Sequence, residues 1–216
     1  MAKRLFRCSL VLGAIGAVLT LLQGGFDRWL FFYCGVWTVF ALYGMVSIDD
    51  DLARERFHPP EPGADRLALR SIRLVALAHI IVGALDAGRW HLAPVPSPLR
   101  AAALPAMLIG GLLIIQSMRA NRFFSPVVRI QKERGHRLVD NGPYGVIRHP
   151  GYLGMLIAIL SSGLALGSWL GFALAAAYGA LILRRVWFED SFLKSNLPGY
   201  EAYANRVVFR LIPGAW

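Results

Sequence analysis

The sequence is poor in charged residues and in cysteine. Only 17% of its 216 residues are charged, and its 13 acidic residues face 23 lysines and arginines. A soluble domain usually carries about a quarter of charged residues. The two cysteines, Cys8 and Cys34, lie in or beside apolar runs, so their spacing supports neither a disulfide framework nor a metal site. The composition therefore argues against both an ordinary soluble domain and a disulfide-rich secreted one.

The sequence also lacks a segment that could fold as a soluble catalytic domain. Its two longest polar segments, 119–148 and 188–216, each have about 30 residues, which is too few to bury a core of their own. No glycine-rich dinucleotide motif follows a strand-like run, and no extended alternating strand pattern appears. If the protein is an enzyme, its site must be built from these two segments and the ends of neighbouring helices.

Long apolar runs are what the sequence has in abundance. Hydrophobic residues make up 56% of the chain, and the mean hydropathy is +0.50. Each run is close to the roughly 20 residues that cross a bilayer. The candidate spans are 5–22, 29–48, 71–87, 99–118, 151–166 and 169–187, of which the fifth is short. The sequence therefore predicts an all-α integral membrane protein with about six transmembrane helices, in a range of five to six.

Small residues within these runs, such as Gly13, Gly16, Ser162 and Gly163, indicate close helix packing in lipid. The short connection at Gly167-Ser168 predicts that the last two helices form an antiparallel hairpin. We expect two regions: residues 1–118 with four transmembrane helices, and residues 119–216 with a cofactor loop, the hairpin and the C-terminal segment.

The basic residues predict the orientation in the membrane. Arg28, Arg89 and Arg100 fall on the side of the first, third and fifth connections, and the remaining lysines and arginines fall on the other side. The positive-inside rule then puts both termini in the cytoplasm. The net charge of +10 indicates affinity for anionic membrane lipids rather than for nucleic acid, because it is spread over several loops. Short loops favour a bacterial inner membrane.

One polar stretch lies directly before the hairpin, at 142–154, and combines a turn, two aromatic residues and a helix start. Within it, Pro150 suits the first turn of a helix, and the exposed N–H groups there favour an anionic ligand group. His149 is then either a hydrogen-bonding site residue or a plain helix cap. Beyond the hairpin, Arg185 and Glu189 share a helix face and form either a helix-end ion pair or a functional pair at the membrane border.

Other polar residues have simpler interpretations. Residues 131–139 read as a polar loop with a turn at Gly135. His79 lies inside the third apolar run, where an interhelical contact is favoured over a metal ligand. The acidic triplet 49–51 is more typical of a helix end than of a metal site. No spacing predicts a zinc site, and no metal is expected.

Taken together, these pieces resemble the isoprenylcysteine carboxyl methyltransferase family of integral membrane enzymes. The resemblance covers about 121–216, a little under half of the chain. Its motifs, in order, are Ser125-Pro126 with Gln131, Arg134-Gly135-His136-Arg137-Leu138-Val139, Gly142-Pro143-Tyr144, Arg148-His149-Pro150-Gly151-Tyr152, Arg185-x-x-x-Glu189-Asp190, Gly199-Tyr200-x-x-Tyr203 and Arg210-Leu211-Ile212-Pro213. Each motif is weak alone, but their order around a helical hairpin is specific.

The resemblance implies S-adenosylmethionine as the methyl donor, bound without a Rossmann fold on the cytoplasmic side. It implies that the cofactor pocket is lined by Gln131, His136, Arg137, Leu138, Val139, Tyr144, His149, Pro150, Gly151, Tyr152 and Glu189. Arg185 would face the acceptor, which would be a lipidic or prenylated molecule. Many members of the family carry a second Glu at the position of Asp190, so the role of this shorter acid is open.

The chemistry of these residues fits carboxyl methylation. A carboxylate acceptor is already ionised at neutral pH, and the planar fork of Arg185 can orient it. Glu189 can hold Arg185 or a polar group of the cofactor. Three alternatives stay open: methylation of a phospholipid amine or a small thiol with the same cofactor, an NADPH-dependent membrane reductase, and a transporter or scaffold without a cofactor.

Overall fold

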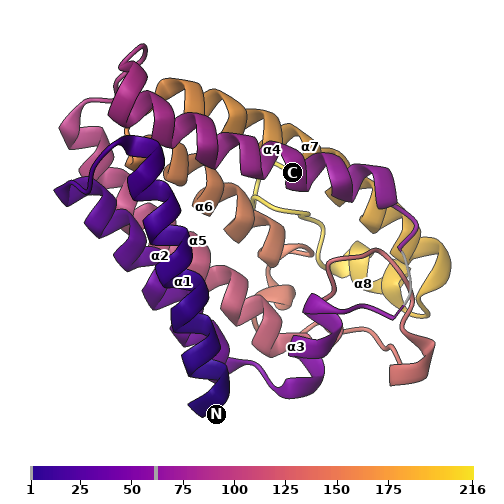
Figure 1. Cartoon of the computed structure of the whole chain (residues 1–216). Coiled ribbons are helices and arrows are strands. Elements are labelled where there is room, and N and C mark those ends of the chain that lie inside the picture. Colours follow the sequence, from indigo (N-terminus) through magenta and orange to yellow (C-terminus); the bar gives the residue numbers. More distant parts are fainter. Residues whose placement is uncertain (1, 61–62) are drawn as a thin grey trace.

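The computed structural model describes residues 2–60 and 63–216. Its described part is helical, with an isolated antiparallel bridge between Pro94 and Ser168 as its β-type pairing. The helices are α1 (Ala2–Gln23), α2 (Arg28–Ser47), α3 (Asp50–Phe57), α4 (Arg66–Leu85), α5 (Ser97–Ala120), α6 (Pro150–Leu166), α7 (Trp169–Asn196) and α8 (Tyr200–Arg206). Short turns η1 (Asp86–Trp90), η2 (Lys132–Arg134) and η3 (Gly142–Gly145) lie between them (Figure 1).

Five of these helices are long and apolar enough to cross a membrane: α1, α2, α4 with η1, α5 and α7. The fifth predicted span, α6, has 17 residues and is the shortest of the six, as expected. Large apolar side chains such as Val39, Leu74 and Leu77 are exposed on the outside of the bundle, where lipid would solvate them. The predicted helical membrane fold is confirmed.

Two helices extend further than the apolar runs indicate. The third span begins at Arg66 instead of 71, and the last continues to Asn196 instead of ending at Trp187. Hydropathy marks only the apolar part of a helix, so the polar turns at these ends escape it. The consequence for the site is that Arg185 and Glu189 both lie well inside α7.

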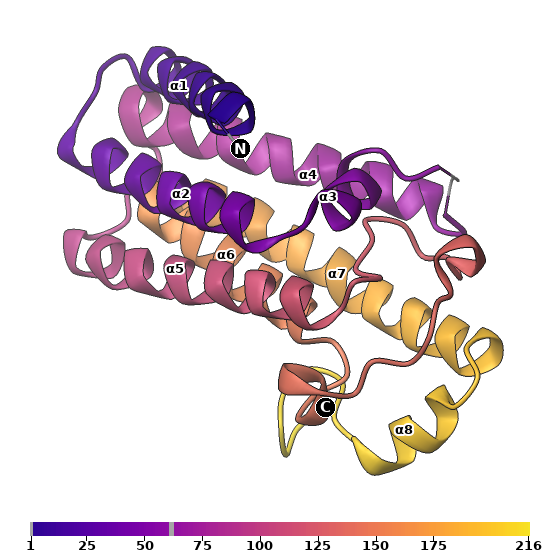
Figure 2. The same cartoon turned by 90° about the horizontal axis from the view of Figure 1, so that it is seen from below.

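The C-terminal helices form the centre of the bundle, with α5 packed along α6 and α4 along α7 (Figure 2). A Cβ atom at Gly110 would lie 2.6 Å from the backbone nitrogen of Ala158, and one at Gly154 would lie 2.7 Å from the carbonyl oxygen of Gly110. Only glycine permits this approach. In contrast, Gly13 and Gly16 have nothing within 4 Å, so the predicted close packing is wrong for α1, which lies at the periphery.

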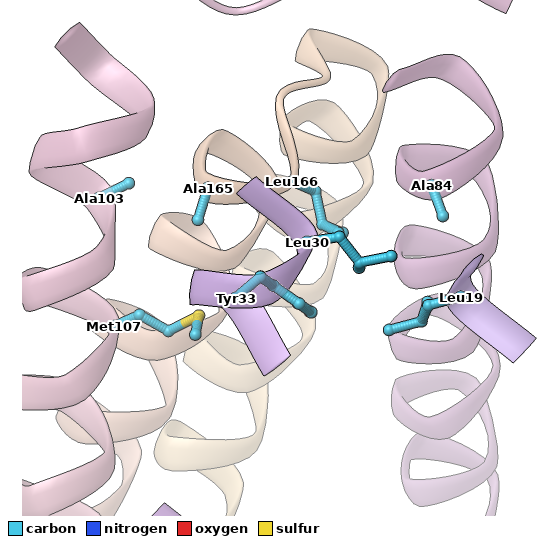
Figure 3. Packing of buried hydrophobic residues seen from close by; sticks show 8 residues of the cluster. All are labelled: Leu19, Leu30, Tyr33, Ala84, Ala103, Met107, Ala165 and Leu166. Carbon is cyan, nitrogen blue, oxygen red and sulfur yellow. The ribbon is translucent and has the colours of Figure 1, made fainter. Parts of the chain in front are cut away.

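The last two transmembrane helices form the predicted hairpin. Gly167 adopts a left-handed φ of 97° and ends α6, and the Ser168 hydroxyl accepts a hydrogen bond from the Gly171 N–H (3.0 Å) to cap α7. The same hydroxyl donates to Asp86 (2.6 Å), which ties the hairpin to the end of α4. An apolar cluster packs near this end, drawn from α1, α2, α4, α5 and α6 (Figure 3).

His79 makes the interhelical contact that the sequence predicts. Its ring nitrogens lie 2.9 Å from the carbonyl oxygen of Gly171 and 3.0 Å from the hydroxyl of Ser162, which also contacts the Tyr33 hydroxyl at 2.8 Å. This fully buried chain of hydrogen bonds joins α2, α4, α6 and α7, so it satisfies polar groups that would be costly in hydrocarbon. His79 therefore has a structural role.

The opposite end of the bundle is where the polar segments gather. Helix α3 begins there with Asp49 as its cap, whose carboxylate accepts from the Leu52 N–H (2.7 Å), as expected for a helix end. The loop from 121 to 149, α8 and the extended end of α7 lie at the same end (Figures 1 and 2). The fold thus brings both polar segments to one end of the bundle.

Candidate functional site

A cavity of about 400 Å³ opens at this end, between α3, α4, the loop from 121 to 139, η3, α6, α7 and α8. Eleven of the predicted site residues line it: Gln131, His136, Arg137, Leu138, Val139, Tyr144, His149, Gly151, Tyr152, Arg185 and Glu189. The remaining one, Pro150, is buried at the first turn of α6 and is not part of this lining. Residues more than 50 positions apart are brought together, as the predicted hairpin requires.

The loop that forms one wall is held by its own polar side chains. The Gln131 amide is buried and donates to the carbonyl oxygen of Phe123 (2.7 Å), while its backbone N–H donates to Nδ1 of His136 (3.2 Å). The His136 ring stacks on Phe123 with centroids 4.6 Å apart. Burial, together with the positive charges of Arg129 and Arg134, lowers the pKa of His136 to about 4. The ring is therefore neutral at physiological pH and can accept this bond.

Asp190 is the centre of a buried charge network on the opposite wall. Its carboxylate pairs with Arg148 in a bidentate geometry (2.7 and 3.0 Å) and with Arg210 (3.1 Å). It also accepts from the Tyr200 hydroxyl (3.0 Å) and lies 3.3 Å from Nε2 of His149. One carboxylate thus joins the start of α6, the end of α7, α8 and the C-terminal segment. Asp190 therefore holds these segments together at this end of the bundle.

His149 occupies the cap position of α6, but its side chain forms no cap hydrogen bond. Its ring instead contacts Asp190 and, at 3.5 Å, the Tyr200 hydroxyl. Its backbone N–H donates to the carbonyl oxygen of Arg210 (2.9 Å). Of the two interpretations offered by the sequence, the geometry therefore favours a hydrogen-bonded residue at the cavity over a plain cap.

Tyrosine hydroxyls complete this network. Tyr203 donates to the carbonyl oxygen of Tyr144 (2.7 Å), which fixes η3 against α8. Burial raises the pKa values of Tyr144, Tyr200 and Tyr203 above their usual range, so these hydroxyls keep their protons and act as donors. These three tyrosines are therefore protonated near neutral pH.

Arg185 lies on the third wall, with a side chain only 5% exposed. Its Nη2 donates to the carbonyl oxygen of Pro126 (2.6 Å) and forms an ion pair with Asp65 (3.0 Å). Among the described residues, its buried Nε has no hydrogen-bond acceptor. Glu189 accepts from the Tyr152 hydroxyl (2.6 Å), so the recorded ion-pair partner of Arg185 is Asp65 rather than Glu189.

The cavity changes from polar to apolar across its width. Beyond Arg185 its lining consists mainly of side chains from three transmembrane helices: Leu69, Ile72 and Ala76 of α4, Met155 of α6, and Tyr178 and Ile182 of α7. Such a lining suits a hydrocarbon chain. The polar walls and the apolar wall meet at Arg185 and Tyr152.

Sequence reasoning missed the contribution of the segment before α4. Arg56 lines the cavity, as does Arg73 within α4, Asp65 pairs with Arg185, and Glu55 forms a buried ion pair with Arg129 (2.7 Å). The signal that could have found them is charge at a membrane border, where an unpartnered ion is costly. The same charges are equally typical of a solvated loop, which is how this segment reads without its partners.

Comparisons with known proteins agree with this architecture. The model of the family described as phospholipid methyltransferase matches residues 99–198. A probable protein-S-isoprenylcysteine O-methyltransferase of Oryza sativa subsp. indica is 34% identical over 90 residues, which are 41% of this chain and 47% of that protein. The chain thus aligns with about half the length of this plant relative. Protein-S-isoprenylcysteine O-methyltransferase of Schizosaccharomyces pombe is 25% identical over 203 residues, covering 85% of this chain and 86% of that one.

Among solved structures, the fold is similar to that of a eukaryotic intramembrane Ras methyltransferase, isoprenylcysteine carboxyl methyltransferase. The TM-score is 0.58 at 20% identity, over 96% of this chain and 75% of the other. Fold and site define a multi-pass helical membrane protein with a polar-to-apolar cavity at one end of its bundle. Within that class, the chain is similar in part of its sequence to the phospholipid methyltransferase family model and to protein-S-isoprenylcysteine O-methyltransferases, and in fold to isoprenylcysteine carboxyl methyltransferase.

Proposed function

We propose that this protein transfers a methyl group from S-adenosylmethionine to the carboxylate of a lipidic, isoprenylcysteine-like acceptor at the cytoplasmic face of a membrane. The observation that carries the proposal is Arg185: a buried guanidinium group whose Nε–H has no acceptor among the described residues, at the point where a polar cavity becomes apolar. The distribution of basic residues supports the cytoplasmic orientation, and the short loops favour a bacterial inner membrane.

The whole cavity has the volume usual for a small-molecule site, and its polar walls carry donors and acceptors for this cofactor. A cavity of about 400 Å³ lies in the range of roughly 300–1,000 Å³ that is usual for such sites. When bound, S-adenosylmethionine would supply an electrophilic sulfonium methyl group: the acceptor oxygen would bond to its carbon while the electron pair of the broken C–S bond leaves on sulfur. Gln131, His149 and Glu189 would hold its polar groups, and Tyr144 and Tyr152 would form walls against its rings. The other lining residues, His136 to Val139 and Gly151, would also contact the cofactor. Pro150 would act by shaping the start of α6.

Arg185 would orient the acceptor. A carboxylate is ionised at neutral pH, so its oxygen can attack without a general base, and the enzyme has mainly to position it. The Nε–H of Arg185 is free to donate to that oxygen, while Nη2 is already fixed by Asp65 and Pro126. Leu69, Ile72 and Met155 would surround the lipid tail. A water-poor border strengthens the attraction between carboxylate and sulfonium.

A phospholipid amine is the second candidate acceptor, because the matching family model carries the name phospholipid methyltransferase. An amine must lose a proton, and Glu189 is the carboxylate that could take it. Two observations weigh against this acceptor. The recorded hydrogen bond of Glu189 comes from Tyr152, and the arginines that line the cavity, among them Arg56, Arg73 and Arg185, would repel a cationic head group.

The test is transfer of a labelled methyl group by the purified protein in lipid nanodiscs. The acceptors are N-acetyl-S-farnesylcysteine, phosphatidylethanolamine and a small thiol, with Glu189→Ala as the inactive control. We expect base-labile label, released as methanol, from the lipid acid alone. Base-stable label in phosphatidylethanolamine would establish the amine reaction instead. Binding of NADPH without binding of S-adenosylhomocysteine would overturn the methyltransferase proposal.

A further inference from the structure

The segment that joins α2 to α4 makes contacts that the proposed reaction does not yet use. Its described residues, 49–60 and 63–65, lie outside the part of the chain that the family model matches, 99–198. Three of its side chains nevertheless reach the site. Glu55 pairs with Arg129, Asp65 pairs with Arg185, and Arg56 lines the cavity. The segment therefore meets the candidate site at three separate points.

Asp65 is fixed by the backbone on both sides of it. Its Oδ1 accepts from the Val128 N–H (3.3 Å), and the Ala64 N–H donates to the carbonyl oxygen of Val128 (3.0 Å). A Cβ atom at Gly63 would lie 2.7 Å from the Cβ of Val127, so the two segments touch directly. The Asp65 side chain is only 4% exposed, and its Oδ2 lies 3.0 Å from Nη2 of Arg185. A carboxylate held this way attracts the Nη2 end of the Arg185 guanidinium group and helps to position it.

Arg56 has no such partner. It lies in the last turn of α3 with its guanidinium 5.1 Å from the centroid of the Phe124 ring. Its electrostatic neighbours are the hydroxyls of Tyr152 and Tyr178 and the cations Arg73 and Arg185. Among the described residues, no carboxylate forms an ion pair with it. A half-buried cation next to two others is unfavourable unless an anion joins them.

We propose that this segment completes the acceptor site: Arg56 supplies a second cation for the anionic group of the lipid acceptor, and Asp65 is a positioning residue that orients Arg185. The site then selects lipid acids over neutral lipids of the same shape. The inference rests on the proposed function, since it assigns the acceptor side of that reaction. It adds two residues from outside the matched region.

The test separates binding from turnover. Two probes are compared by isothermal titration calorimetry in detergent: S-farnesylthioacetic acid and its primary amide, which share shape and tail. We expect the protein to bind the acid more tightly. Arg56→Gln should weaken binding of the acid about tenfold, the usual range for a lost hydrogen bond to a charged group, and leave binding of the amide unchanged. Arg54→Gln, an exposed position on the same helix outside the cavity, is the matched control.

Asp65→Asn keeps the shape of the side chain and its hydrogen bond from Val128 but removes the charge that holds Arg185. We expect the KM for the lipid acid to rise several-fold while the affinity for S-adenosylhomocysteine stays the same. A residue with a merely structural role would disturb both. Glu55→Gln on the same segment should instead disturb the loop from 121 to 139, through Arg129, and weaken binding of S-adenosylhomocysteine.

Equal affinity of the wild-type protein for acid and amide would overturn the inference, as would an equal loss of both in Arg56→Gln. A loss of S-adenosylhomocysteine affinity in Asp65→Asn would reduce Asp65 to a structural residue and also contradict it. The proposed function fails separately. If the acid binds in an Arg56-dependent way but no methyl group is transferred, the anion-selective lipid site stands and the methyltransferase reaction does not.

Discussion

At the scale of single residues, the site depends on which charges are matched. Asp190 is surrounded by Arg148, Arg210 and His149, whereas among the described residues the recorded ion-pair partner of Arg185 is Asp65. A buried carboxylate that neutralises its neighbours holds the walls together, and a cation with spare donors can bind a ligand. Aspartate and arginine thus form a structural network around Asp190 and a candidate binding group at Arg185, and the number of charged partners makes the difference.

Asp190→Asn tests the structural role of this carboxylate. The change leaves Arg148, whose side chain is 3% exposed, without its counter-ion, and such a loss costs on the order of 3 kcal/mol. We expect a clear fall in Tm, measured by tryptophan fluorescence in detergent, with no change in Glu201→Gln, an exposed acid on α8. Asp190→Glu should also lower Tm, because the extra methylene has no space beside Arg148 and Tyr200. A wild-type Tm in Asp190→Asn would contradict this role.

His136 gives the site a defined pH behaviour. Its pKa in the folded protein is about 4, below the usual value of 6.5, because burial and the nearby arginines disfavour the charged ring. Between these values the unfolded chain binds a proton that the folded protein does not, so stability falls as pH drops from about 6.5 toward 4. Above 6.5 this contribution is complete and constant.

An NMR titration of histidine-labelled protein checks the value directly. The His136 signal, assigned with the His136→Asn variant, should show no inflection between pH 6 and 8. An inflection near pH 6.5 would mean that the ring is exposed and that the Gln131 hydrogen bond does not hold the loop.

At the scale of helices, glycine determines how closely the central helices pack. Gly110→Ala would place a Cβ atom 2.6 Å from the backbone of Ala158, so α5 and α6 must separate. We expect a destabilisation of about 1–3 kcal/mol, seen as a lower Tm. Gly16→Ala on α1 meets nothing within 4 Å and should be neutral or slightly stabilising because alanine favours helix. An equal effect of both variants would show that this packing is not tight.

The helices also show how far the sequence can be interpreted. Apolar runs predict the spans, Gly167-Ser168 predicts the hairpin, and ordered motifs predict eleven residues that do line the cavity. Hydropathy does not predict that α7 continues past Trp187, since its last turns are polar and are stabilised by contacts with α8 and the C-terminal segment. Nor does it predict that Arg56 and Asp65 belong to the site. Their contacts, Phe124 and Arg185, lie tens of residues away, and their charges look like those of a solvated loop.

At the scale of the whole molecule, the cavity joins two sites that should be separable. The two polar walls, which are the loop from 121 to 139 with η3 and the Asp190 network, form the first part, and α4, α6 and α7 around Arg185 form the second. His149→Ala removes a ring that contacts Asp190 and Tyr200 in the first part. Arg185→Ala removes the cation in the second.

If the walls bind different molecules, His149→Ala should raise the Kd for S-adenosylhomocysteine about tenfold, the loss of one hydrogen bond in a charged network, with a smaller change in the KM for the lipid acid. Arg185→Ala should leave that Kd within twofold and raise the KM for the acid by at least tenfold. Calorimetry gives the first quantity and labelled methyl transfer the second. If both variants weakened both ligands equally, the cavity would act as one undivided site. If each variant instead weakens binding of a different ligand, the hairpin brings together a cofactor wall and an acceptor wall whose contacts are independent.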